Sequence, residues 1–130
     1  MNKDGPEFTS RFQDNLPADS NRENHPRQVE NACYSFVTPK KAPAPKLVAF
    51  SEALAEQLGF DEAFCLSPRF AEIFVGNVQL AGMKPYAMCY GGHQFGNWAG
   101  QLGDGRAIAL GELADTQGES LTFQLKGSGP

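Results

Sequence analysis

The sequence feature that most restricts the fold of this chain is a glycine-rich stretch at residues 90–106. Glycine stands at positions 91, 92, 96, 100, 103 and 105, and the stretch shows little hydrophobic periodicity. Because glycine has no Cβ, such a stretch can turn sharply and can let a ligand approach the main chain. Residues 90–106 are therefore expected to turn repeatedly, either as plain turns or as a loop that binds an anion.

The end of this stretch has the composition of a phosphate site. Gly103 and Gly105 offer amide N–H groups without side-chain obstruction, and Arg106 adds a planar fork of donors for phosphate oxygens. Glycine pairs in tight hairpins also form ordinary turns, so this pattern alone leaves the turn alternative open. Asp104 lies between the glycines, where aspartate more often bonds its own turn than a cation, and it is left out of the predicted site.

Two strands are predicted directly after the glycines. The first covers residues 106–113, a polar loop covers 115–120, and the second strand covers 121–126. The first strand has two different faces. One face carries the small residues Ala107, Ala109 and Gly111 and could lie against the flat base of a nucleotide. The opposite face is apolar and carries Ile108 and Leu110. The predicted core face of the second strand consists of Leu121, Phe123 and Leu125, which leaves Lys126 on the other side.

A glycine loop, a strand, a hairpin and a second strand that ends in lysine follow one another in protein kinases, where that lysine holds nucleotide phosphates. The spacing from Gly105 to Lys126 suits two strands and their turn. Two departures disfavour an ordinary kinase. No glycine stands three positions after Gly105, and Phe-Gln-Leu-Lys at 123–126 replaces Val-Ala-Ile-Lys.

At these residues the chain resembles the selenoprotein O family, which consists of kinase-like protein adenylyltransferases. The resemblance is carried by Tyr-Gly-Gly-His-Gln-Phe-Gly at 90–96, Gln-Leu-Gly-Asp-Gly-Arg at 101–106 and Leu-Lys-Gly-Ser-Gly-Pro at 125–130. It extends upstream through residues 26–35 and 45–51, so that only the extreme N-terminus lies outside it.

The resemblance implies a kinase-like fold that binds ATP in a flipped orientation. It implies transfer of AMP to Ser, Thr or Tyr hydroxyls of protein substrates, with pyrophosphate as the leaving product. By position, the implied ATP contacts are Gly103, Gly105, Arg106 and Lys126. The catalytic aspartate and the residues that bind Mg²⁺ or Mn²⁺ are expected after Pro130, so no catalytic or metal-binding residue is assigned within the chain, which is interpreted as an inactive N-terminal fragment.

The fold class predicted from these patterns is α+β, with a polar N-terminal arm at 1–31, a segment with two short helices at 32–85, and the start of the nucleotide-binding lobe at 86–130. The arm is expected to dock loosely, because only Phe8, Phe12 and Leu16 form a weak apolar face. Tyr34–Val37 is expected to be extended.

Two helices are predicted from their end signals. Ser51 caps the first, at 52–58, whose inward face is Leu54 and Leu58 and which Gly59 ends. The second begins at Ser67-Pro68 and ends at Gly76; its inward residues are Phe70, Ile73 and Phe74.

A proline-rich linker at 38–45 favours polyproline II. It carries Lys40 and Lys41, read either as a solvated charge pair or as a contact for an acidic partner.

Composition excludes several classes of function. Eleven basic against fifteen acidic residues give a net charge of −4, which disfavours nucleic acid as a partner. Cys33, Cys65 and Cys89 are odd in number and far apart in sequence, which indicates no disulfide framework. No apolar run is long enough to span a membrane, and the acidic N-terminus lacks the features of a signal or mitochondrial presequence, so a cytoplasmic location with no membrane partner is expected.

The residues leave three alternatives open. Trp98 could stack on adenine or pack against the protein. His93 and Cys89 are interpreted as structural, because two ligands are too few for a metal site. The whole pattern would also suit a catalytically silent nucleotide-binding pseudokinase module, or a scaffold in which the glycines are only turns.

Overall fold

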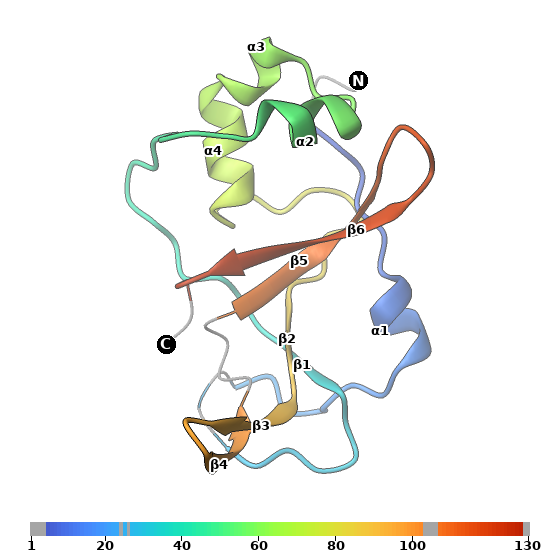
Figure 1. The fold of residues 1–130 in the computed structure, drawn as a ribbon, viewed down its shortest axis with the longest axis vertical. Coiled ribbons are helices and arrows are strands. Elements are labelled where there is room, and N and C mark those ends of the chain that lie inside the picture. The colour runs from blue at the N-terminus through green and yellow to red at the C-terminus, as the bar shows by residue number, and fades with distance from the viewer. Residues whose placement is uncertain (1–4, 24, 26, 103–106, 129–130) are drawn as a thin grey trace.

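The computed structural model describes residues 5–23, 25, 27–102 and 107–128. Within these ranges the chain is an α+β structure with antiparallel sheets, as the sequence predicts (Figure 1). The helices are α1 (Arg11–Asn15), α2 (Glu52–Gln57), α3 (Glu62–Cys65) and α4 (Pro68–Phe74). The strands are β1 (Tyr34–Phe36), β2 (Tyr86–Met88), β3 (Tyr90–Gln94), β4 (Asn97–Leu102), β5 (Ala107–Ala114) and β6 (Ser120–Lys126).

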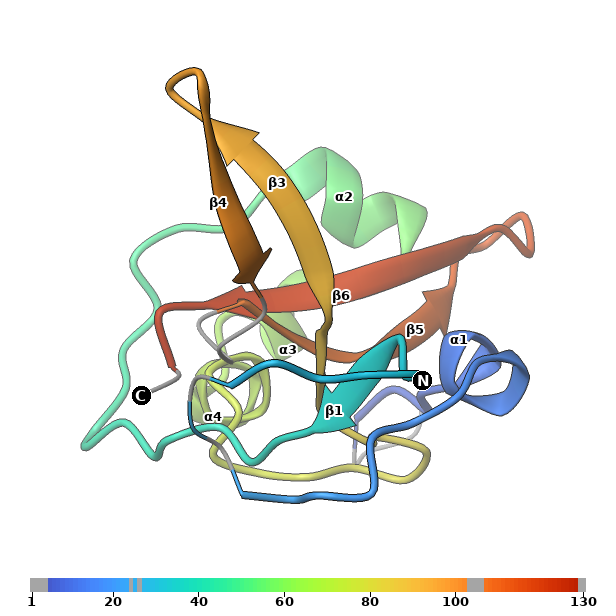
Figure 2. The same ribbon diagram turned by 90° about the horizontal axis from the view of Figure 1, so that it is seen from below.

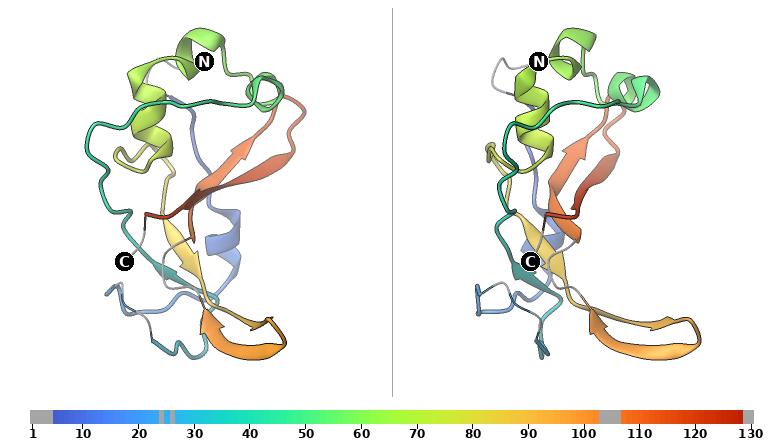
Figure 3. Two further views of the ribbon diagram at one scale, coloured as in Figure 1. Left: turned by 60° about the vertical axis from the view of Figure 1, so that its left-hand side comes forward. Right: turned by 90° about the vertical axis from the view of Figure 1, so that its left-hand side faces the viewer.

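The strands form two separate antiparallel sheets. Four of them lie side by side in the order β1-β2-β5-β6, while β3 and β4 pair only with each other. Figure 2 shows this second hairpin projecting from the body of the molecule, and both views of Figure 3 show the same projection. The four-stranded sheet therefore organises the core.

The short helices begin where side-chain oxygens cap them. Ser51, Asp61 and Ser67 each accept a hydrogen bond from the backbone N–H three residues later, which satisfies one of the free donors at a helix start. Helices α2 and α4 confirm the sequence prediction, whereas α1 and α3 were not predicted. None of the helices in the described ranges is long and apolar enough to cross a membrane.

The inward face of α2 differs from the predicted one. Leu58 packs against the core, but Leu54 is 41% exposed and the buried residue of the helix is Ala55. With only six residues, α2 makes less than two turns, so one turn of apolar contact is enough to hold it. In α4 the prediction is confirmed, since Ile73 is fully buried and Phe70 and Phe74 are packed together.

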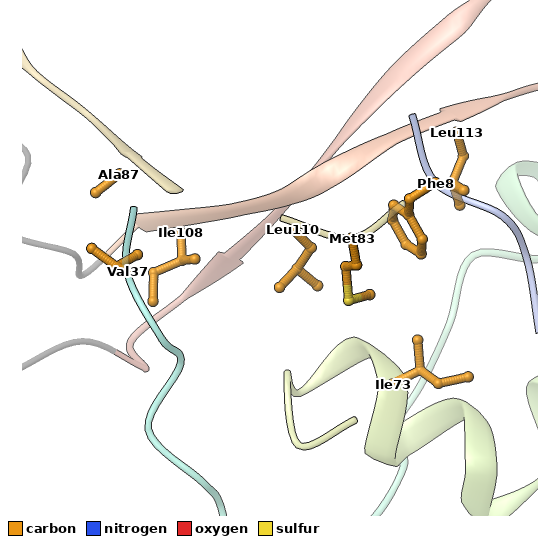
Figure 4. Packing of buried hydrophobic residues seen from close by; sticks show 8 residues of the cluster. All are labelled: Phe8, Val37, Ile73, Met83, Ala87, Ile108, Leu110 and Leu113. Atoms are coloured by element: carbon orange, nitrogen blue, oxygen red, sulfur yellow. The ribbon is translucent and has the colours of Figure 1, made fainter. Parts of the chain in front are cut away.

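The main core lies between the sheet and the helices. Figure 4 shows the buried apolar side chains of this core, which come from β2, β5, α4 and segments next to these elements. Its buried members are Phe8, Val37, Ile73, Met83, Ala87, Ile108, Leu110 and Leu113. The partly buried Phe123 and Leu125 pack against it from β6, which confirms the predicted core face of that strand.

The N-terminal arm is part of this core, so the prediction of loose docking is wrong. Phe8 is only 3% exposed, and its backbone N–H donates to the carbonyl of Ala81 at 3.0 Å. Thr9 forms an isolated antiparallel bridge with Glu112 of β5, and the N–H of Phe12 donates to the Glu112 carboxylate at 3.0 Å. Sequence reasoning weighed only the spacing of apolar residues, whereas backbone pairing with β5 holds this segment.

A second apolar cluster covers the other face of the sheet. Tyr34, Tyr86 and Ala109 are its buried members, and Phe12 stacks on Tyr86 with ring centroids 5.0 Å apart. Burial raises the pKa of both tyrosine hydroxyls, because the charged phenolate would lose its water. Ala109 therefore lies against the chain's own aromatic rings, and the predicted open face for a flat base is wrong at this residue.

A β-bulge between Ala109 and Gly111 also breaks the predicted alternation of β5. The partner of Ala109 is Gln124 and the partner of Gly111 is Phe123, so Leu110 is an extra residue on β5. After the bulge, the side of Gly111 faces Phe8, where an added Cβ would lie 2.9 Å from the Phe8 ring. Gly111 thus makes room for Phe8 and does not continue the face of Ala109.

Asp19 anchors the later part of the arm. Its carboxylate accepts hydrogen bonds from the N–H of Asn21 at 3.0 Å, from the Ser35 hydroxyl at 3.1 Å and from the Arg27 guanidinium. The backbone donor of Asn21 is the main cause that lowers the Asp19 pKa below its ordinary value, with help from Arg27 and Ser35. The arm is therefore tied to β1 as well as to β5.

We predict that Phe8→Ala lowers the free energy of unfolding by about 3 kcal/mol, because it empties a closed space in the core. Urea unfolding followed by circular dichroism measures this loss. Phe95→Ala is the matched control: Phe95 is 104% exposed at the tip of the β3–β4 hairpin, so its truncation should change stability little. Equal stability of the two variants would contradict the core role of Phe8.

We predict that Asp19 contributes to acid sensitivity. Its folded-state pKa lies below the ordinary value of 3.8, so its stabilisation is complete above that pH and is lost as the pH falls through the lower folded value. The difference in melting temperature between the wild type and Asp19→Asn should be largest near neutral pH and should shrink below about pH 4. Glu30→Gln, an exposed change in the same arm, is the control, and its melting temperature should not approach that of the wild type as the pH falls.

Candidate functional site: the lysine end of the β5–β6 hairpin

The candidate site lies where β5 begins and β6 ends. Ala107 and Lys126 are directly opposite each other in this antiparallel pair. Along β6 the exposed residues alternate with the partly buried ones, so Lys126 is exposed and shares a face with Gln124. Side chains opposite each other in such a ladder point to one face, which places Lys126 on the Ala107 side of the sheet.

Of the four residues predicted to contact ATP, only Lys126 can be placed. Gly103, Gly105 and Arg106 lie outside the described residues, as does Asp104. Ala107 follows Arg106 directly in the sequence, so the register joins Lys126 to the strand that the glycine run enters. Lys126 thus lies at the start of β5, while its return to the glycine loop and the assignment of all four residues to ATP stay predictions.

Residues 90–102 form a regular hairpin, not the repeated turns expected from their glycines. Strands β3 and β4 pair from Tyr90–Leu102 to Gln94–Asn97, with one irregularity between Gly91 and His93. Only the tip turns sharply, where Phe95 and Gly96 both have positive φ. Glycine removes side-chain obstruction but does not prevent strand pairing, which is why composition alone missed these strands.

Trp98 packs on its own hairpin. It lies opposite His93 in the register, and the two ring centroids are 5.1 Å apart. The indole remains 62% exposed, and no ring other than that of His93 contacts it among the described residues. His93 is therefore engaged with Trp98, while Cys89 lies beside Ser35, with Oγ and Sγ 3.9 Å apart.

Side chains that could ligate a metal do not cluster within the described residues. Within them, no three or more His, Cys, Asp or Glu side chains gather in a way that could hold an ion. The location of the Mg²⁺ or Mn²⁺ implied by the family resemblance stays a prediction.

Gln101 holds the hairpin against the N-terminal arm. Its side-chain oxygen accepts from the N–H of Val29, and its side-chain nitrogen donates to the carbonyl of Val29 at 2.9 Å. The amide thus pairs with Val29 much as a neighbouring strand would. The contact joins residues far apart in sequence, and no local pattern signals it. It fixes β4 just before the glycine run at 103–105.

A shallow hollow adjoins Lys126. Its volume is about 240 Å³. Residues from the proline-rich segment, the end of α4 and the end of β6 line it: Lys40, Lys41, Ala42, Val75, Leu125, Lys126, Gly127 and Ser128. The structure thus brings the Lys40-Lys41 pair next to the lysine of the candidate site.

A glycine run that leads into a hairpin ending in lysine is an arrangement that nucleotide-binding small lobes use for phosphates. Comparison of the sequence with protein families gives the assignment. The family described as "Protein adenylyltransferase SelO" matches residues 18–130. The chain belongs to the SelO family of protein adenylyltransferases.

Curated relatives support the same assignment. The chain is 58% identical over 123 residues to the "Protein nucleotidyltransferase YdiU" of Azoarcus sp. (strain BH72), covering 95% of this chain and 24% of that protein. It is 56% identical over 125 residues to the protein of that name from Aromatoleum aromaticum, covering 93% of this chain and 24% of the relative. The relative from Rhodopirellula baltica is 52% identical over 122 residues, covering 94% of this chain. The chain spans about a quarter of the length of these relatives.

We predict that Gln101→Ala loosens the hairpin. Removing the amide leaves the N–H and C=O of Val29 without their partner, a loss of about 1 kcal/mol in local stability. Hydrogen exchange of the Val29 amide should therefore become several-fold faster. Gln94→Ala is the control, because Gln94 is exposed on the same hairpin and its side chain has no such contact among the described residues. Equal exchange in both variants would argue against the Gln101 contact.

Proposed function

We propose that the protein transfers AMP from ATP to Ser, Thr or Tyr hydroxyls of other proteins. The acceptor oxygen forms a bond to the α-phosphorus, the bond from that phosphorus to the bridging oxygen breaks, and pyrophosphate leaves while the hydroxyl gives up its proton. Family membership over residues 18–130 is the observation that carries this proposal. We also propose a cytoplasmic location for the protein.

The proposal gives the whole protein a kinase-like fold, of which the β5–β6 hairpin belongs to the small lobe. Its ATP contacts would be Gly103, Gly105, Arg106 and Lys126. The pairing of Ala107 with Lys126 supports this, because it puts a cationic side chain at the sheet end that the glycine run reaches. Glycine amides and Arg106 would then hold the phosphates beside the Lys126 ammonium.

Lys126 would act through its charge. Pyrophosphate carries away negative charge as it leaves, and a fixed cation close to it stabilises that charge without rearranging in the transition state. Lys126 is held at the end of a long paired strand, so its backbone is positioned before the nucleotide arrives. The flipped orientation of ATP, which presents the α-phosphorus to the acceptor, is part of the proposal.

We predict that the full-length protein, given ATP labelled at the α-phosphate, labels itself or a substrate protein, while label at the γ-phosphate is not transferred. Intact mass should rise by one AMP and not by one phosphate. Transfer of γ-label alone would mean an ordinary kinase. Binding of ATP without any transfer would favour the catalytically silent nucleotide-binding module.

The same assay tests Lys126. Lys126→Ala should reduce AMP transfer at least a hundredfold, because a phosphate charge in the cleft loses its cation. Lys46→Ala removes the same charge from an exposed position outside the candidate site, and it should keep wild-type activity. Wild-type turnover and ATP affinity in Lys126→Ala would show that the lysine has no such role.

A further inference from the structure

The hollow beside Lys126 has fixed walls. The backbone N–H of Lys40 donates to the carbonyl of Ser128 at 2.9 Å, which ties the proline-rich segment to the residues that follow β6. Ala42, two residues after Lys40, is held by the side chain of Asn77. The Asn77 amide accepts a hydrogen bond from the N–H of Ala42 and donates one to its carbonyl, each at 2.9 Å. Lys41 lies between these two anchors. The backbone that carries both lysines is therefore positioned before any ligand binds, which lowers the entropy cost of binding.

The hollow concentrates positive charge. Lys40, Lys41 and Lys126 all line it, and none of the described residues in its lining is acidic. The ion pairs within the described ranges involve His25, Arg27 and Lys84, and none involves a lysine of the hollow. Glu72, whose carboxylate accepts a hydrogen bond from the Asn77 side chain at 2.7 Å, does not line the hollow. Three like charges gathered this way favour an anion between them.

A polar atom without a partner belongs to the same wall. The Oγ atom of Ser128 is buried and has no hydrogen-bond partner in the structure. A buried hydroxyl without a partner costs free energy that a bound acceptor would recover. Ser128 lines the hollow, so this hydroxyl belongs to a residue next to where an anion would bind.

The size of the hollow limits the ligand. At about 240 Å³ it is smaller than the range of about 300 to 1,000 Å³ typical of sites for drug-sized molecules. Among the described residues, the lining offers no aromatic ring for a base. A compact oxyanion with several charges suits both this volume and the three lysines that line the hollow.

We propose that this hollow binds pyrophosphate, with Lys40, Lys41, Lys126 and the hydroxyl of Ser128 as its contacts. The inference rests on the proposed function for the source of the ligand, since pyrophosphate is the product that AMP transfer releases beside Lys126. Lys126 borders both the candidate nucleotide site and the hollow. Lys40 and Lys41 thus extend the phosphate-binding surface onto the proline-rich segment and draw the leaving product away from the nucleotide site.

The test is a calorimetric titration of the full-length protein with pyrophosphate, without ATP or acceptor protein. The double variant Lys40→Ala/Lys41→Ala should raise the dissociation constant about tenfold. The side chains of Lys40 and Lys41 are both exposed, so their truncation should leave the fold intact. Lys46→Ala is the matched control, because Lys46 is an exposed lysine of the same region that does not line the hollow, and it should change the dissociation constant less than twofold.

Several results would overturn the proposal. One is that the wild type shows no measurable binding of pyrophosphate, and another is that the double variant keeps the wild-type dissociation constant. A third is that Lys46→Ala weakens binding as much as the double variant does, which would mean that pyrophosphate is attracted by the general surface charge. Tighter binding of an acidic peptide than of pyrophosphate would assign the hollow to a protein partner. Because the titration needs no catalysis, its outcome is independent of whether the α-label experiment succeeds.

Discussion

The seating of Phe8 against β5 is the contact on which the rest of the structure depends. It requires two close approaches: an added Cβ at Gly82 would lie 1.6 Å from the Phe8 carbonyl oxygen, and one at Gly111 would lie 2.9 Å from the Phe8 ring. With Phe8 in place, Thr9 pairs with β5 and the backbone of Phe12 reaches Glu112. The N-terminal arm thereby closes the core and positions the aromatic rings on the opposite face of the sheet.

That arrangement determines which parts of the sheet remain available to a ligand. Tyr34 and Tyr86 occupy the surface over Ala109, so the middle of β5 is closed to a flat base. The open part of the hairpin is its far end, where Lys126 stands opposite Ala107. The middle of the sheet thus contributes to the aromatic cluster, whereas the candidate phosphate site lies at the end of the sheet that carries Lys126.

The elements that sequence predicts well are those with strong local signals. Ser51 and Ser67 cap α2 and α4 where expected, and the alternation of Leu121, Phe123 and Leu125 identifies the core face of β6. The elements it misses are held by distant partners. Strand β2 has only three residues and pairs with β1 and β5. The pairing of Gln101 with Val29 and the approach of Lys40 and Lys41 to Lys126 likewise join segments far apart in the chain.

The sequence by itself determined the family and the residues that cap the helices. It also determined that a glycine run, two strands and a lysine follow one another, with Lys126 as the candidate cation. Local spacing and residue type carry all of these. Only the tertiary structure decided that the arm is buried, that a bulge at Leu110 turns Gly111 toward Phe8, and that three lysines share one hollow. Those outcomes depend on long-range packing and on backbone pairing, in which any residue type can take part, so no local pattern specifies them.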